Sequence, residues 1–274
     1  MLIILLVGFL FYDSNARLVT REYVLRYANL PEPFDGYRIV VLSDIHATEF
    51  GNGNKRLIAK VAQARPDVIV IAGDLIDFNE KKPIEDQIAI AETLVEGLGP
   101  IAPVYYITGN HEWDRRIGGP RELLQMLEEK GVCVLRNAYS LLEEGAASIM
   151  LAGTDDPNGP ADMIKPDEFV GRIREAEGDG FIVMLEHRNN NLELYSGLGV
   201  DLVLCGHAHG GVIRLPFTDG LIGPQRDWFP THTSGVYTMG NTDMLVSRGL
   251  GNSWGIPRLL NNPQIVVAVL VVDS

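Results

Sequence analysis

The segment that most constrains this chain is the apolar run at residues 39–42, which leads through Ser43 into Asp44, Ile45 and His46. Four consecutive apolar residues predict a strand that is buried on both faces. Residues two apart in an extended chain point to the same side, so Asp44 and His46 can reach one point in space. Open α/β folds place their chemistry at the carboxyl ends of such strands, and the segment therefore predicts a site there.

Four further predicted strands end in the same way. They cover residues 68–72, 104–107, 181–185 and 201–205, and each is followed by polar side chains: Asp74; then Asn110, His111 and Glu112; then Glu186 and His187; then His207 and His209. Five of the six histidines fall in these clusters, and only His232 lies elsewhere. We therefore expect five strands to converge on one rim that carries the site.

The order of the elements predicts an α/β fold. Helical patterns at residues 54–64, 83–98, 120–130 and 166–177 are interleaved with the strands. This alternation predicts parallel strands joined by right-handed crossovers. A strand over residues 17–25, three short strands within 132–153 and a closing strand over 265–272 complete two sheets flanked by helices.

The charge balance limits the partners. The formal net charge of −13 argues against nucleic-acid binding, which needs a basic surface to displace counterions. A small phosphorylated substrate is still compatible with an acidic chain, because bound metal ions reverse the local sign of a site. No linker composition divides the chain, so residues 17–274 are predicted to form a single catalytic domain behind an apolar segment at residues 1–16.

The first 12 residues are apolar and uncharged. This length is well short of the roughly 20 residues that a membrane-spanning helix needs. A signal peptide would have a basic residue before the apolar core and a small-residue cleavage site after it, and neither is evident. We interpret the segment as a shallow or truncated anchor that associates the protein with a membrane, on a side that the sequence does not define; a buried strand and a miscalled start codon are the alternatives.

The types of the clustered side chains indicate metal binding. Mixed carboxylate, amide and imidazole ligands suit divalent first-row metals and zinc better than calcium. The candidate ligands number seven, which is more than one ion needs, and they fit two adjacent ions that share one carboxylate. Such a pair can clamp the attacking and leaving oxygens of a displacement at phosphorus.

Taken in order, five blocks of this sequence resemble those of the calcineurin-like metallophosphoesterase superfamily. The blocks are Asp44-Ile45-His46, Gly73-Asp74, Gly109-Asn110-His111-Glu112, His187 and Gly206-His207-Ala208-His209, and the resemblance covers residues 38–215. Residues 214–216 and 247–251 are similar to a membrane-associated bacterial branch that includes phosphodiesterases and UDP-2,3-diacylglucosamine pyrophosphatases. The resemblance implies an α-β-β-α sandwich of two mixed sheets flanked by helices.

The resemblance also implies a role for each clustered residue. Asp44, His46 and His209 would hold a first metal, Asp74 would bridge two metals, and Asn110, His187 and His207 would complete the second site. The two divalent ions would be Mn, Zn, Fe or Mg, and a hydroxide between them would be the nucleophile. His111 would protonate the leaving oxygen or stabilise the charge that develops on it.

The expected activity is hydrolysis of phosphodiester or pyrophosphate bonds in a phosphorylated small molecule or a lipid-linked substrate. The alternatives are a phosphomonoesterase acting on proteins or small molecules, and a non-catalytic metal-binding scaffold. Two departures from the family pattern affect substrate contacts and not the metal ligands. Residues 188–191 read Arg-Asn-Asn-Asn where relatives carry a Pro-acidic pair, and Val212 replaces a frequent Gln.

Other polar and aromatic residues have open interpretations. Glu112 is expected to fix a loop by hydrogen bonds. Asp155 and Asp156 either line the substrate pocket or form a solvated turn, and Arg248 either holds a phosphate oxygen or is a plain surface or loop-bracing arginine. An aromatic-rich segment either packs under the sheet or forms a lipid-facing lip; its members are Phe217, Leu221, Ile222, Trp228 and Phe229.

Overall fold

The computed structural model describes residues 2–78, 82–114, 116, 118–160, 163–215, 219–223, 226–253 and 255–273, with side chains from residue 8 onward. Phe217, one of the aromatic residues singled out above, lies outside the described residues.

The first sheet has six strands in the order β1-β12-β2-β3-β4-β5. Their bounds are β1 Val19–Tyr27, β12 Gln264–Val272, β2 Arg38–Leu42, β3 Val68–Ala72, β4 Val104–Ile107 and β5 Cys133–Val134. Strands β2 to β5 are parallel to one another, as the alternation of strands and helices predicts. The C-terminal strand β12 lies between β1 and β2, parallel to the former and antiparallel to the latter.

The second sheet also has six strands, in the order β10-β11-β9-β8-β7-β6. They are β6 Ala138–Glu144, β7 Ala147–Gly153, β8 Ile182–Leu185, β9 Leu202–Cys205, β10 Gly235–Met239 and β11 Thr242–Val246. The four central strands are parallel, and the two edge strands are antiparallel to their neighbours. Both sheets are therefore mixed, as expected.

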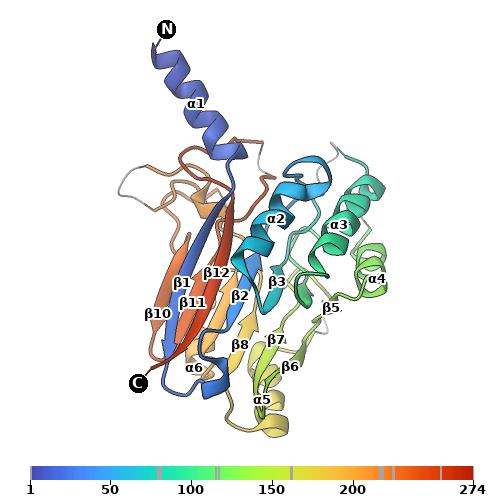
Figure 1. Ribbon diagram of the computed structural model, residues 1–274, viewed down its shortest axis with the longest axis vertical. Coiled ribbons are helices and arrows are strands. Elements are labelled where there is room, and N and C mark those ends of the chain that lie inside the picture. The colour runs from blue at the N-terminus through green and yellow to red at the C-terminus, as the bar shows by residue number, and fades with distance from the viewer. Residues whose placement is uncertain are drawn as a thin grey trace.

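Helices cover the outer faces of the sheets (Figure 1). Helices α2 Lys55–Ala64, α3 Ile84–Leu98 and α4 Arg121–Glu129 follow strands of the first sheet, and α5 Pro166–Glu177 and α6 Leu192–Gly197 follow strands of the second. Short 3₁₀ turns occupy Glu32–Phe34, Asn52–Asn54 and His209–Gly211. A central core in which Val41 and Val70 meet Val183 and Leu204 joins the two sheets, with a further core under the helices of each sheet. The four-layer α-β-β-α prediction is confirmed.

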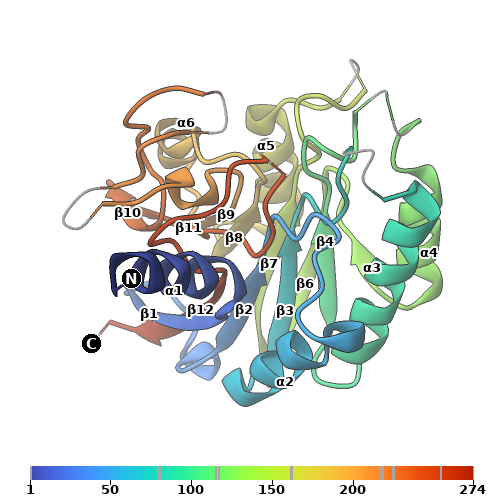
Figure 2. The same cartoon turned by 90° about the horizontal axis from the view of Figure 1, so that it is seen from above.

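Residues 2–16 form helix α1 (Leu2–Ala16), which projects from one end of the sandwich (Figures 1 and 2). Phe9 and Tyr12 on this helix are 62% and 68% exposed, so the alternative of a buried strand is wrong. Among the residues that the structure describes, no helix combines the length and the apolarity needed to cross a membrane. Strand β2 runs toward the end from which α1 projects (Figure 1), and β3 and β4 are parallel to it; β8 and β9 are parallel to each other.

Candidate metal centre

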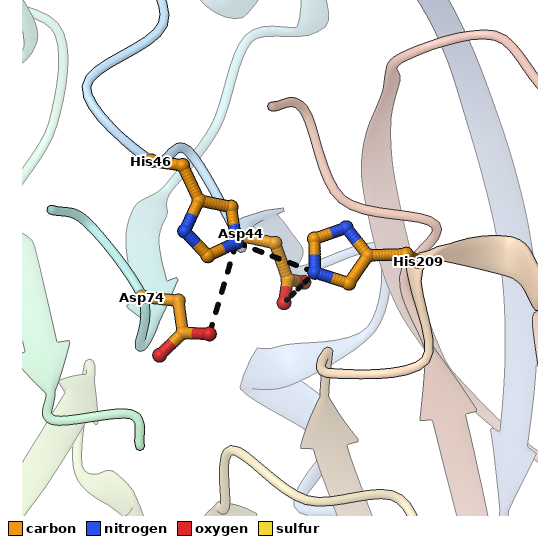
Figure 3. A group of neighbouring side chains, drawn as sticks. All are labelled: Asp44, His46, Asp74 and His209. Atoms are coloured by element: carbon orange, nitrogen blue, oxygen red, sulfur yellow. Dashed lines mark hydrogen bonds and ion pairs between the residues drawn. The ribbon is translucent and has the colours of Figure 1, made fainter. Parts of the chain in front are cut away.

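Four side chains from three strand ends form a first ligand group (Figure 3). Asp44 and His46 follow β2, Asp74 follows β3 and His209 follows β9. The Nε2 atoms of His46 and His209 are 3.3 Å apart, and Asp44 Oδ1 is 3.5 Å from the latter. Asp74 Oδ2 lies 3.8 Å from His46 Nε2. All four side chains are buried.

A second ligand group shares Asp74 with the first. His187 follows β8, and its Nε2 atom is 3.2 Å from Asp74 Oδ2 and 3.2 Å from His207 Nδ1. The Oδ1 atom of Asn110, from the loop after β4, is 3.1 Å from the same His187 nitrogen. The structure thus brings together all seven residues that the sequence proposes as ligands, and Asp74 belongs to both groups.

The spacing of these atoms fits divalent cations. Ligand atoms about 2.1 Å from one ion lie about 3.0 to 3.4 Å from each other, near the spacing in both groups. The nitrogens that lie within these groups are Nε2 of His46 and Nδ1 of His207. Burial, together with neighbouring cationic groups, lowers the pKa of His46 to about 4 and that of His207 to about 3. Both imidazoles are therefore neutral near pH 7, the form that binds metal.

The buried carboxylates provide the negative charge for such ions. Burial, reinforced by Asp74, raises the pKa of Asp44 to about 6. Burial opposes a charge on His187, but the adjacent Asp74 carboxylate outweighs it and raises the pKa of His187 to about 10. Asp74 is correspondingly ionised, with its pKa held well below the usual value by His187 and His111 against the effect of burial. A cation in the second group would take the place of the His187 proton.

The backbone at the site is strained. Five of the seven candidate ligand residues have a positive φ between 48° and 64°, in the left-handed region that non-glycine residues seldom occupy: Asp44, His46, Asp74, His207 and His209. Such conformations cost free energy and persist where the surrounding structure imposes them, most often at functional sites. The backbone therefore turns sharply just after each strand, and this turn directs the side chain of each of these residues back over the strand ends.

Glu112 stabilises the backbone turn at Asp74 and its own loop after β4. Its carboxylate accepts hydrogen bonds from the backbone N–H groups of Asp74, Leu75, Ile76 and Gly109, at 2.7 to 3.2 Å. These bonds tie the loop after β3 to the loop after β4. The expectation that Glu112 fixes a loop is confirmed.

His111 faces the ligand groups and is held from behind by Asp77, a residue that the sequence interpretation missed. His111 Nε2 is 3.7 Å from Asp74 Oδ2, and Nδ1 is 2.9 Å from Asp77 Oδ1. Phe78 stacks on the imidazole with 4.2 Å between the ring centroids. Burial opposes a charge on His111, yet Asp74 and Asp77 together raise its pKa. The only sequence signal was a second acid three residues after Asp74.

His46, Asp77 and His111 also lie close enough together to be considered as a cation site. The 2.9 Å contact between Asp77 and His111 is the length of a charge-assisted hydrogen bond. Nε2 of His46 faces His209 and Asp74 in the first ligand group. We therefore interpret Asp77 as a partner of His111.

A cavity of about 760 Å³ opens over the ligand groups. Its wall includes the ligands Asp74, Asn110, His207 and His209, together with His111 and Phe78; the remaining lining residues are Ile222, Arg226, Trp228, Ser253 and Ile256. Trp228 and Phe229 are each 70% exposed, so the interpretation that they pack under the sheet is wrong. Their loop lies outside both sheets, where no core is available to them.

Asp155 and Asp156 are buried, so the solvated-turn interpretation is wrong. Asp155 accepts a hydrogen bond from Thr108 and pairs with Arg136, whereas Asp156 forms a two-bond pair with Arg188. Neither acid lines the cavity over the ligands.

Arg248 is likewise absent from that cavity wall. Its backbone carbonyl accepts a hydrogen bond from Arg258, and its N–H donates to Gln264. These backbone contacts brace the loop and do not involve the guanidinium of Arg248. Arg258 itself was missed by the sequence interpretation, although it is only 2% exposed and its guanidinium lies 3.4 Å from Nδ1 of His209.

Comparison with known proteins agrees with this architecture. The family model described as calcineurin-like phosphoesterase matches residues 37–211. The uncharacterized metallophosphoesterase YkuE of Bacillus subtilis is 29% identical, over 96% of this chain and 89% of its own length. The phosphodiesterase YaeI of Escherichia coli is 26% identical, over 86% of this chain and 82% of its own length.

Two further matches cover only about half of the length of the other protein. A Danio rerio transmembrane protein with metallophosphoesterase domain is 30% identical, over 88% of this chain and 54% of its own length. The structure of the NAD nucleotidase NadN from Haemophilus influenzae superimposes with a TM-score of 0.52 at 15% identity, covering 79% of this chain and 45% of that protein. At that identity the match supports the fold alone.

Proposed function

Starting from the premise that the chain belongs to the calcineurin-like phosphoesterase family, we propose that it is a hydrolase with two divalent cations that cleaves phosphodiester or pyrophosphate bonds. The observation that carries the proposal is the position of Asp74. This buried carboxylate belongs to two separate groups of ligand atoms, one with Asp44, His46 and His209 and the other with His187 and His207. A shared carboxylate is the arrangement that holds two cations side by side.

In this proposal each ligand residue has a defined part. Asp44, His46 and His209 hold the first cation, Asn110, His187 and His207 hold the second, and Asp74 holds both. When bound, the cations supply an acidified water for attack and positive charge for the phosphate oxygens. The mixed donor set favours Mn, Zn, Fe or Mg.

His111 is the proposed proton donor. Its Nε2 atom faces the cavity beside Asp74, while Asp77 holds the opposite nitrogen. The two neighbouring carboxylates favour the protonated imidazole. A proton at Nε2 can therefore pass to the leaving oxygen as the ester bond breaks.

Two observations support a preference for diesters: the size of the cavity and the activity of one relative. A volume of about 760 Å³ leaves room for groups on both sides of a phosphate. The Escherichia coli relative is described as a phosphodiesterase. A phosphomonoesterase and a non-catalytic scaffold are the rival functions; the complete ligand set and His111 favour catalysis over the scaffold.

The test is turnover by metal-stripped protein to which Mn²⁺, Zn²⁺, Fe²⁺ or Mg²⁺ is returned. We expect activity to need the metal and a bis-aryl phosphate to be cleaved faster than a mono-aryl phosphate. Faster cleavage of the monoester would favour the phosphomonoesterase. A protein that binds two equivalents of metal yet cleaves no ester or pyrophosphate would favour the scaffold.

We also propose that the protein associates with a membrane through α1 and takes a phosphorylated small-molecule or lipid-linked substrate. Helix α1 projects at the end of the sandwich where the strands deliver the ligands (Figure 1). Exposed apolar residues gather near the cavity as well, with Trp228 and Ile256 in its wall and Phe229 beside them. The Danio rerio relative is described as a transmembrane protein. The net charge of −13 disfavours nucleic acid as a partner.

A further inference from the structure

The last turn of α1 is bound to a C-terminal segment by side-chain hydrogen bonds. We call this contact between residues 13–15 and residues 258–262 the helix seat. Asn15 and Arg258 bond reciprocally, with Asn15 Nδ2 donating to the Arg258 carbonyl at 2.9 Å and the Arg258 N–H donating to Asn15 Oδ1 at 3.0 Å. Ser14 Oγ accepts from the N–H of Leu260, and Asn262 donates to the carbonyl of Asp13. Figure 1 shows the C-terminal loops at the base of α1.

The same C-terminal segment reaches the first ligand group. Arg258 Nη2 lies 3.4 Å from Nδ1 of His209, the ring nitrogen opposite the one that faces Asp44 and His46. Asn261, which is fully buried, donates to the backbone carbonyl of His209 at 2.7 Å. One short segment therefore contacts α1 on one side and the imidazole and backbone of a ligand residue on the other.

The loop that carries His209 needs this support. Residues 209–212 all have positive φ, between 45° and 68°, and two of them are His209 and Val212. A β-branched residue such as Val212 is strongly disfavoured there. Asn261 donates to the carbonyls of both residues, and Arg258 Nη1 donates to the carbonyl of His209 at 3.5 Å. The strained conformation is thus held by groups on the helix seat.

We infer that Arg258 and Asn261 are positioning residues for His209 through its backbone carbonyl, to which both donate, and that the helix seat sets their position, so that α1 controls the cation affinity of the first ligand group. This inference rests on the proposed two-cation site. The residues next to metal ligands orient those ligands, and their loss weakens metal binding roughly ten- to a hundredfold. Disturbing the seat is expected to weaken the first group and to leave His187, His207 and Asn110 unaffected.

The test is Mn²⁺ titration of metal-stripped protein by calorimetry. Asn15→Ala removes both bonds to Arg258 and alters no ligand. We expect the first group to bind Mn²⁺ at least about tenfold more weakly, with the second unchanged. The matched control is Tyr12→Ser on the same helix, whose side chain is 68% exposed and which should bind like wild type. A purely structural role for Asn15 would lower the melting temperature and leave both affinities unchanged, and this result would overturn the inference.

Hydrogen exchange of the wild-type protein gives a second test that needs no variant. Coupling between two sites is reciprocal, so binding of Mn²⁺ should strengthen the helix seat. The N–H groups of Arg258 and Leu260, both bonded to α1, should then exchange more slowly in the loaded protein. Unchanged exchange there, in protein that binds two equivalents of Mn²⁺, would contradict the inference alone. Failure of wild type to bind two equivalents would instead contradict the proposed function.

Discussion

Nδ1 of His111 lies 2.9 Å from Oδ1 of Asp77, and the opposite ring nitrogen lies 3.7 Å from Asp74. The imidazole is thus held between two carboxylates, of which only Asp74 belongs to the proposed ligand groups. This arrangement orients the ring and favours its protonated form without requiring His111 to bind metal.

Replacement of Asp77 should therefore slow the reaction without loss of metal. We expect Asp77→Asn to lower kcat by about ten- to a hundredfold, because the amide keeps the shape but supplies no charge to the imidazolium. The measurement is kcat beside metal content by elemental analysis. His111→Ala should show the same pattern with a larger loss of rate, and loss of metal in either variant would show that the residue is a ligand.

Asp74→Asn should abolish turnover and leave the domain folded. The change removes the one carboxylate shared by both ligand groups, so binding of two equivalents of metal should fail. Circular dichroism and metal titration would be measured beside activity. A rate within about tenfold of wild type would contradict the shared role.

Gly109→Ala should damage the site through close packing. A Cβ at this position would lie against Oδ1 of Asp74 and 2.6 Å from its backbone nitrogen, so either the loop or the carboxylate must move. We expect weaker binding of metal and loss of activity. The control is Gly171→Ala in α5, where a Cβ would meet no atom within 4 Å. That variant should retain activity, since alanine suits a helix interior better than glycine.

The pair of Asp156 with Arg188 should matter for stability. Asp156 is buried and accepts two hydrogen bonds from the guanidinium, at 2.8 and 3.0 Å. Asp156→Ala leaves a largely buried arginine unpaired and should lower the free energy of unfolding by about 3 kcal/mol. Arg172→Ala breaks the exposed pair with Glu168 and should cost about 1 kcal/mol or less. Chemical denaturation compares the two, and equal effects would contradict the prediction.

Membrane association should depend on the exposed aromatic residues beside the cavity. We expect a Trp228→Ser and Phe229→Ser double variant to bind phospholipid vesicles more weakly in sedimentation assays, because aromatic side chains stabilise contact with the lipid interface. Leu141→Ser, in β6 and 37% exposed, is the control and should sediment with vesicles as wild type does. Equal vesicle binding by all three proteins would contradict the proposed lipid-facing role.

The sequence by itself determined the strands and the set of clustered candidate ligand residues. Runs such as residues 39–42 and 68–72 are apolar throughout, so they form strands wherever the fold places them, and the polar residues that follow must lie at strand ends. Parallel pairing of β2, β3 and β4 then brings Asp44, Asp74 and Asn110 to one edge. This much follows from local pattern and chain order.

Only the tertiary structure decided how those ligands are supported. Arg258 contacts His209 across 49 residues of sequence, and Asn15 contacts Arg258 across 243. No periodicity connects such positions, because they are brought together by the long-range topology that places β12 between β1 and β2. The sequence left Asp156 open as a pocket residue or a turn residue, and only the structure shows that it is buried and paired with Arg188. Local sequence sets the strand and the residue type, whereas contacts between distant segments set the burial, charge and orientation of each side chain.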